Sequence, residues 1–166
     1  MALLLRSEAP ADRQPVHALN VAAFRQPDEA DLVDRLRQRA RPYLALVAED
    51  AGEIVGHIAF SPVAVQGATG VLGLAPMAVR PDRQRAGIGS ALVRAGLAAC
   101  RDAGAGAVVV LGHPLYYPRF GFAPAHTFGL RDEYGAPPEA FMALELTPGA
   151  LAEAEGVVRY HAAFAG

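Results

Sequence analysis

The chain has 166 residues and a formal net charge of −2. This length suits one domain with one hydrophobic core, and we predict a single domain over residues 1–166. Fifteen basic residues are offset by seventeen acidic ones, so the charge does not favour a nucleic-acid partner. Arg6 closes the short apolar N-terminus, and no later stretch approaches the length of a membrane span. We therefore predict a cytoplasmic protein with no membrane partner.

The only cysteine, Cys100, excludes an internal disulfide, and it argues against a structural zinc site because such sites mostly use several thiolates. It falls on the apolar side of a predicted helix. A nucleophilic cysteine would need exposure and a nearby base, whereas a small buried hydrophobic residue needs neither. We interpret Cys100 as a core residue, and we predict no metal.

The first 66 residues predict a strand, two helices and a β-hairpin from the spacing of their apolar residues and the turn residues between them. Asp28 or Asp31 is expected to cap the second helix, which Pro42 ends. The predicted elements are a strand at 3–6, a helix at 10–24, a helix from 28 or 31 to 42, and hairpin strands at 43–48 and 54–65.

The next predicted strand, Val71–Val79, contains Pro76, which cannot donate a hydrogen bond to a neighbouring strand. The proline is compatible with a bulge, and the alternative is an irregular edge strand. Further along, the pattern predicts a helix at 87–103, a strand covered on both faces at 107–111, a loop at 123–138 and strands at 141–146 and 157–160. The alternation of helices and strands predicts α/β layering.

The segment from Gln84 to Ser90, QRAGIGS, predicts an anion-binding loop. It follows a strand and a Pro-Asp turn and opens a helix, whose first backbone N–H groups are unpaired and carry partial positive charge. Gly87 and Gly89 remove side chains where the backbone must approach a ligand closely. Arg83 and Arg85 flank the turn and are placed to add charge-assisted contacts. A phosphate or pyrophosphate fits such a helix start.

Two common phosphate-binding motifs do not fit this segment. Leu92 stands where the dinucleotide-binding motif G-x-G-x-x-G needs its third glycine. All fifteen basic residues are arginine, so the lysine of a Walker loop is absent. A nucleotide-dependent oxidoreductase is an alternative function that the missing third glycine disfavours. The motif that the segment does contain is Q-x-x-G-x-G.

The motif from Gln84 to Gly89 resembles the pyrophosphate loop of the GNAT superfamily of acyl-CoA-dependent N-acyltransferases, which reads Q/R-x-x-G-x-G/A at the start of a helix. A second segment, VVVLGHPLYYPRFGF at 108–122, resembles the strand, break and short aromatic turn of these proteins, which carry a tyrosine four residues before a Gly-Phe pair. Tyr117 holds that position, and Tyr116 is one residue out of register. The sequence motif His-Pro-x-Tyr-Tyr-Pro-x-Phe-Gly-Phe is similar to that of a bacterial subgroup of N-acetyltransferases.

The resemblance implies a mixed α/β (α+β) fold, in which a central, mostly antiparallel mixed sheet contains a splayed strand and is flanked by helices. The splayed strand, here with Pro76, leaves a V-shaped gap whose backbone pairs with the pantetheine arm of the thioester. The implied cosubstrate is acetyl-CoA, and a backbone amide on the splayed strand is expected to stabilise the oxyanion. The expected binding residues are Met77, Ala78, Val79, Gln84, Arg85, Ala86, Gly87, Ile88, Gly89 and Ser90.

Tyr117 matches the family's tyrosine that donates a proton to the sulfur of CoA. A phenol suits this role because it is neutral at pH 7 and can hydrogen-bond a forming thiolate. Packing is its alternative role, and Tyr116 is the alternative donor. No ionisable side chain lies at 72–79, where many relatives carry an acidic general base. His113, His57 or water alone therefore remain as ways to remove the proton from the amine.

We predict an enzyme, an N-acetyltransferase that moves an acetyl group from acetyl-CoA to an amine by direct attack. The alternative is a non-catalytic acyl-CoA-binding sensor or interaction module of the same fold, which the missing carboxylate suggests. The acceptor is left open as a small-molecule or protein amine. Residues 24–42 and 123–138 are expected to form the walls of the acceptor-binding site. A monomer and a homodimer both fit the sequence.

Overall fold

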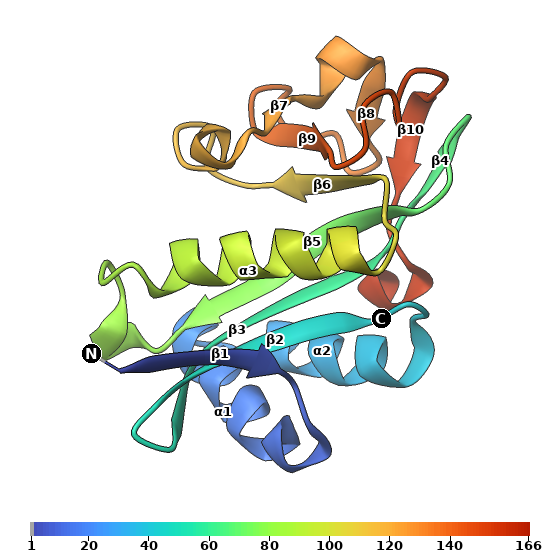
Figure 1. The fold of residues 1–166 in the computed structure, drawn as a ribbon. Helices are drawn as coiled ribbons and strands as arrows, with labels where there is room; N and C mark the ends of the chain where they lie inside the picture. The colour runs from blue at the N-terminus through green and yellow to red at the C-terminus, as the bar shows by residue number, and fades with distance from the viewer. Residues whose placement is uncertain (1) are drawn as a thin grey trace.

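The computed structural model describes residues 2–166, and its centre is a seven-stranded sheet (Figure 1). The strand order is β1-β2-β3-β5-β6-β9-β7, and each neighbouring pair is antiparallel except β5 with β6. The mostly antiparallel mixed sheet that the resemblance implied is confirmed. The strands are β1 (Leu3–Ser7), β2 (Leu44–Asp50), β3 (Glu53–Pro62), β5 (Val71–Val79), β6 (Ala107–Leu111), β7 (Ala123–Pro124) and β9 (Phe141–Glu145).

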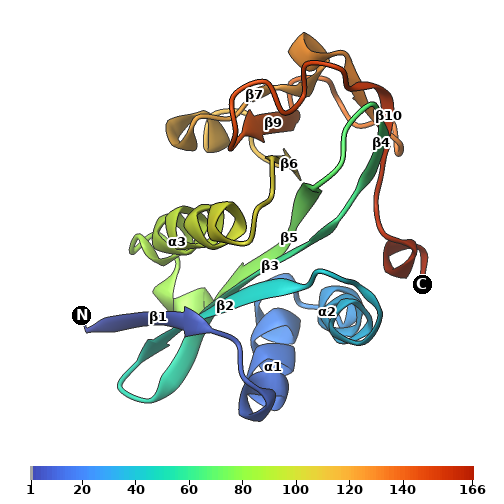
Figure 2. The same ribbon diagram turned by 45° about the vertical axis from the view of Figure 1, so that its right-hand side comes forward.

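Helices cover both faces of this sheet (Figure 2). Helix α3 (Ile88–Asp102) lies on one face, and α1 (Arg13–Phe24) and α2 (Asp28–Arg39) lie on the other. A second sheet of three strands, in the order β4-β10-β8, joins a strand that follows β3 to two strands of the C-terminal part. Its strands are β4 (Ala64–Gln66), β10 (Glu155–Arg159) and β8 (Leu130–Asp132), and the short helices are η1 (Pro10–Asp12), η2 (Pro81–Arg83), η3 (Tyr117–Phe120), η4 (Ala125–Phe128) and η5 (Ala162–Ala165).

Period-two alternation in the strands divides the core between the two faces of the sheet. On β3, Ile58 and Phe60 join the apolar cluster that includes the inner face of α3. Helix α3 packs so closely there that a Cβ atom on Gly96 would stand 2.6 Å from the Phe60 ring. On the opposite face, Val71 and Val109 join a second cluster with the C-terminal segments. Each face of the sheet therefore has its own apolar cover.

Strands β5 and β6 pair over only part of their length. The parallel register runs from Val71 opposite Ala107 to Leu74 opposite Val110 and then stops. On its other edge β5 continues to pair with β3, with a register shift at the point where Ala75 and Pro76 stand. Among residues 2–166 no strand pairs with the second edge of 75–79, and Figure 1 shows β5 and β6 diverging there. The bulge expected at Pro76 is present, and the proline stands where the strand turns away.

Two local predictions were wrong. Neither expected aspartate caps α2, because the cap position is Pro27 and Asp28 is already the first helical residue. The stretch at 123–138, expected to be a loop, contains β7, η4 and β8. Strands β7 and β8 have only two and three residues, too few for an alternating pattern to show, and their pairing with Ala143 and Gly156 depends on the tertiary fold.

Candidate active site

The start of α3 has the backbone geometry of an anion cradle. Gly87 is the N-cap residue with φ of 86°, in the left-handed region that glycine tolerates best, and Arg85 also has a positive φ of 63°. A Cβ on Gly87 would meet nothing within 4 Å, so the space in front of the cradle is open. The Gln84 side chain anchors the loop to the splayed strand, because its Nε2 donates to the Val79 carbonyl oxygen at 3.2 Å. The first N–H groups of α3 thus face an accessible surface beside β5.

The residues expected to bind acetyl-CoA lie in different environments. Ile88 points into the core with 1% of its surface exposed, so only its backbone N–H is available to a ligand. Ala78 is also buried, whereas Met77 and Val79 are partly exposed and pack toward α3. A Cβ on Gly89 would lie 3.6 Å from Met77 Cε and 3.8 Å from Val79 Cγ2. The fold therefore brings the cradle against the unpaired part of β5.

The arginines near the cradle are engaged to different degrees. Arg83 Nη2 donates to Asp50 Oδ2 at 2.8 Å, so this guanidinium is tied to the end of β2 rather than free to meet a phosphate. Arg85 has no hydrogen bond or ion pair to any of the described residues. Of the two arginines expected to contact an anion, Arg85 is the one whose charge remains available.

The two adjacent tyrosines take different positions. The Tyr116 hydroxyl lies 2.9 Å from Ser90 Oγ, at the cradle. Tyr117 is 8% exposed, and its ring packs against Phe122 and against Gly112, where an added Cβ would collide with it. It shares the core with Leu74 and Val110, the last paired residues of β5 and β6. Tyr117 therefore stands near the point where the strands separate, and Tyr116 stands at the helix start.

The Tyr117 hydroxyl is protonated at neutral pH, as a proton donor must be. Its hydroxyl makes no hydrogen bond with the described residues and is not among the fully enclosed polar atoms, so part of the small exposed surface belongs to it. Burial, with a smaller effect from Tyr116, raises the pKa of Tyr117 to about 12. The phenol holds its proton at neutral pH.

His113 lies on the exposed surface just beyond β6, and its Nδ1 accepts a hydrogen bond from the Leu115 backbone N–H at 3.1 Å. An accepting Nδ1 places the proton of a neutral imidazole on Nε2. Neither ring nitrogen then has a free lone pair with which to take a proton from an amine.

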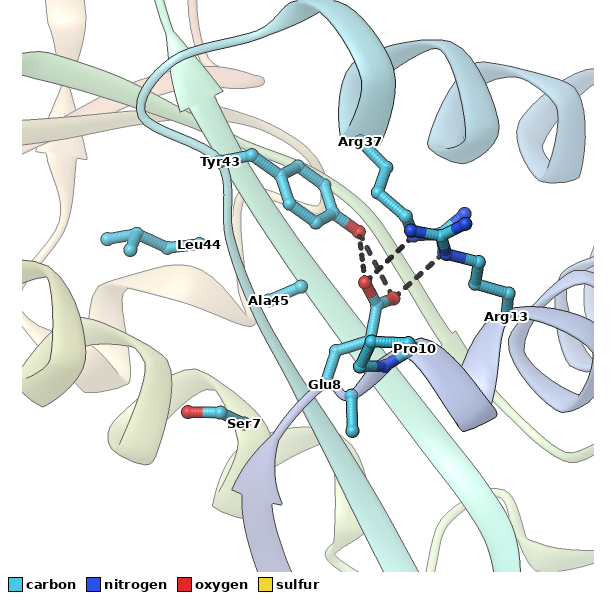
Figure 3. A pocket seen from close by; sticks show the side chains of 9 residues that line it. Ser7, Glu8, Pro10, Arg13, Arg37, Tyr43, Leu44 and Ala45 are labelled. Atoms are coloured by element: carbon cyan, nitrogen blue, oxygen red, sulfur yellow. Dashed lines mark hydrogen bonds and ion pairs between the residues drawn. The ribbon is translucent and has the colours of Figure 1, made fainter.

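His57 is fully enclosed and belongs to a buried ion-pair network on the α1/α2 face. Its Nε2 lies 3.0 Å from Glu8 Oε1. Arg37 donates twice to the same carboxylate at 3.0 Å, and the Tyr43 hydroxyl donates to it at 3.1 Å, as Figure 3 shows. Burial alone would raise the pKa of Glu8, but the hydrogen bonds from His57 and Arg37 outweigh it and hold the pKa at about 2. We interpret this network, beside a cavity of about 290 Å³ that Glu8 and Arg37 line, as structural.

Sequence reasoning missed one cavity at the diverging strands. It is lined by Leu74, Ala75, Leu111, Tyr134, Tyr160 and Phe164. Only Tyr134 falls in a segment expected to contribute to an acceptor site. Tyr160 directly follows β10 and Phe164 lies in η5, and their aromatic side chains near the C-terminus were the only signal in the sequence for this cavity.

Comparison with known proteins agrees with this geometry. The model of the acetyltransferase (GNAT) family matches residues 13–122. The uncharacterized N-acetyltransferase YhbS of Escherichia coli K12 is 39% identical over 164 residues, which cover 98% of each chain. A crystal structure of E. coli YhbS in complex with CoA superposes with a TM-score of 0.92 at 38% identity, over 99% of this chain and 92% of that one. A GNAT family acetyltransferase from Brucella melitensis, in complex with acetyl-CoA, gives a TM-score of 0.81 at 41% identity, over 98% of both chains.

A helix-start cradle beside a strand that parts from its parallel neighbour defines an acyltransferase of the GNAT class, and the chain belongs to the GNAT family. Within that family it is an N-acetyltransferase similar to YhbS over nearly its whole length. The family predicted from Gln84–Gly89 and the Tyr117 segment is confirmed. Within residues 2–166, no helix has the length and apolar character needed to cross a bilayer.

Proposed function

We propose that this protein transfers an acetyl group from acetyl-CoA to an amine by direct attack of the amine on the thioester. The observation that carries the proposal is the proximity of two unpaired sets of backbone groups, those at the start of α3 and those of β5 beyond Leu74. The first set suits a pyrophosphate and the second suits the amides of a pantetheine arm. The CoA complex of YhbS and the acetyl-CoA complex from Brucella support the same ligand here.

The cradle holds the pyrophosphate through the backbone N–H groups of Gly87 to Ser90, and Arg85 adds a charge. The pantetheine arm runs along the free edge of Met77 to Val79 toward the point where β5 and β6 meet. The thioester then lies near the bulge, where a backbone N–H of 77–79 stabilises the negative oxygen that forms during attack.

The reaction needs no covalent enzyme intermediate. The neutral amine nitrogen forms a bond to the thioester carbonyl carbon, and collapse of the tetrahedral intermediate breaks the carbon–sulfur bond. The nitrogen loses one proton and the departing sulfur gains one. Tyr117 supplies the proton to sulfur, since the sulfur and the pyrophosphate occupy opposite ends of the pantetheine arm and Tyr116 stands at the pyrophosphate end.

Water carries the proton away from the amine. Strand β5 has no ionisable side chain, His57 is enclosed and bonded to Glu8, and His113 uses its Nδ1 lone pair on the Leu115 N–H. None of these groups offers a free base next to the thioester.

Isothermal titration with acetyl-CoA and CoA, followed by a thiol-release assay with a panel of amines, tests the proposed function. Binding together with amine-dependent release of CoA supports the transferase. Binding with no release from any amine class favours the acyl-CoA sensor, and absence of binding contradicts both.

Replacing Gly89 by valine should weaken acetyl-CoA binding by about tenfold or more, since one lost set of backbone contacts is worth about 1.4 kcal/mol. The branched methyl groups would meet Met77, Val79 and the Tyr116 hydroxyl, which lie 3.5–3.8 Å from the position of a Cβ. Gly89→Ala is the matched control, because a single Cβ fits at those distances. Equal affinity of the folded valine variant and the wild type, measured by calorimetry, would contradict the assigned cradle.

A further inference from the structure

A histidine and two aspartates meet between α1 and α2, the two helices on the face of the sheet opposite α3 (Figure 2). His17 comes from α1, whereas Asp31 and Asp34 come from α2, where a spacing of three residues puts them on the same side of the helix. Each side chain has a nitrogen or oxygen atom that lies within 4.8 Å of the corresponding atoms of the other two. His17 Nδ1 and Asp34 Oδ2 are 3.0 Å apart. The three side chains therefore converge on one point of the surface.

We propose that His17, Asp31 and Asp34 bind a divalent transition-metal ion such as Zn²⁺, and that the ion joins α1 to α2. The imidazole distinguishes this group from an acidic patch, because oxygen ligands alone suit Mg²⁺ or Ca²⁺ whereas imidazole suits zinc, copper and nickel. The two carboxylates together match the charge of a dication. The site contains no cysteine, so the single buried Cys100 does not bear on it.

The separations of the three side chains suit a common ion. Nitrogen and oxygen ligands lie about 2.0–2.2 Å from zinc, so two ligands of the same ion are separated by up to about twice that distance. The side chains of His17 and Asp34 are 39% and 41% exposed, and Asp31 is exposed as well. A small rotation of these accessible side chains closes the group around an ion that arrives from solvent. Three protein ligands leave further coordination positions to water.

Asp34 is held in position by Arg37. Arg37 Nη1 donates to Asp34 Oδ1 at 3.0 Å, while the second oxygen, Oδ2, faces His17. A hydrogen bond to the other oxygen of a carboxylate ligand orients it for metal binding. Arg37 also donates twice to Glu8, so its positive charge is already matched by a buried carboxylate. The guanidinium therefore orients Asp34 with little net repulsion of a cation.

Asp31 supplies a negative charge that the described residues leave unmatched. Its carboxylate makes no hydrogen bond or ion pair with any of them. Arg35, one turn further along α2, donates its Nε to the Ala163 carbonyl oxygen at 3.0 Å instead. Like charges three or four residues apart on a helix repel, so Asp31 and Asp34 destabilise each other in the absence of a cation. A bound dication would remove this repulsion.

The first test is a calorimetric titration of Zn²⁺ into the full chain at neutral pH, in a buffer free of chelators. We expect one Zn²⁺ per chain with a Kd in the micromolar range, and a Kd for Ca²⁺ that is about tenfold or more weaker. Absence of saturable Zn²⁺ binding below about 1 mM would overturn the inference. Equal affinity for Ca²⁺ would also overturn it, because it would indicate an acidic patch that does not use the imidazole.

The second test repeats the titration with His17→Ala and Asp31→Asn. Each should weaken Zn²⁺ binding by about tenfold or more, since loss of even an indirect partner of a metal ligand commonly costs that much. Asp28→Asn is the matched control, because it removes one exposed negative charge from the first turn of the same helix. His126→Ala is the control for an exposed histidine elsewhere. Unchanged affinity in folded His17→Ala, or an equal loss in Asp28→Asn and Asp31→Asn, would overturn the inference.

Co²⁺ gives a spectroscopic readout of the ligands themselves. We expect a visible absorption band of bound Co²⁺ that Zn²⁺ displaces and that changes or disappears in His17→Ala. A band that is identical in wild type and His17→Ala would show that the imidazole is not a ligand. These titrations use neither acetyl-CoA nor an amine, so their outcome is independent of the proposed function.

Discussion

Glu8→Gln should lower the free energy of unfolding by about 3 kcal/mol at pH 7, the lower end of what breaking a buried ion pair costs. The glutamine keeps the shape of the side chain but leaves Arg37 and His57 without the carboxylate that joins them. Glu8 is 6% exposed in its side chain, so water cannot replace the lost charge. The melting temperature should fall by about 10 °C for a chain of this size. Glu139→Gln, at an exposed position, is the control.

The difference between wild type and Glu8→Gln should shrink in acid. The folded-state pKa of Glu8 is about 2 against an ordinary 4.5, so the carboxylate stabilises the fold above its unfolded pKa and loses this effect as pH falls through the folded one. Urea unfolding at pH 7 and near pH 2 measures the change. A difference that stays constant over this range would show that the charge of Glu8 does not stabilise the fold.

Tyr117→Phe should lower kcat by about 100-fold, within the usual contribution of a positioned general acid. The variant keeps the ring that packs on Phe122 and Gly112 and removes only the proton donor. The acetyl-CoA Kd should therefore stay close to that of wild type. Steady-state kinetics at saturating substrates and calorimetry of the same sample provide the two values.

Tyr116→Phe is the matched control for that experiment. Its hydroxyl contacts Ser90 at the cradle, so its removal should alter acetyl-CoA affinity modestly and leave kcat nearly unchanged. The reverse pattern, with kcat lost in Tyr116→Phe and kept in Tyr117→Phe, would transfer the acid role to Tyr116.

The sequence alone determined the local features of this protein. The glycine spacing and helix start at 84–90 predicted the cradle, because it depends on backbone rules that act within a few residues. Pro76 was compatible with the bulge that the resemblance implied, but an irregular edge strand fitted the sequence as well. The loop motif at Gln84–Gly89, together with the spacing of Tyr117 from Gly121 and Phe122, was enough to find the family.

Only the tertiary structure decided which side chains meet. Glu8 and His57 are 49 residues apart and form an ion pair because β1, β2 and β3 lie side by side. Tyr134, Tyr160 and Phe164 line one cavity with Leu74 because the C-terminal segments fold back over β5. Such contacts depend on strand order and register, which local periodicity does not encode.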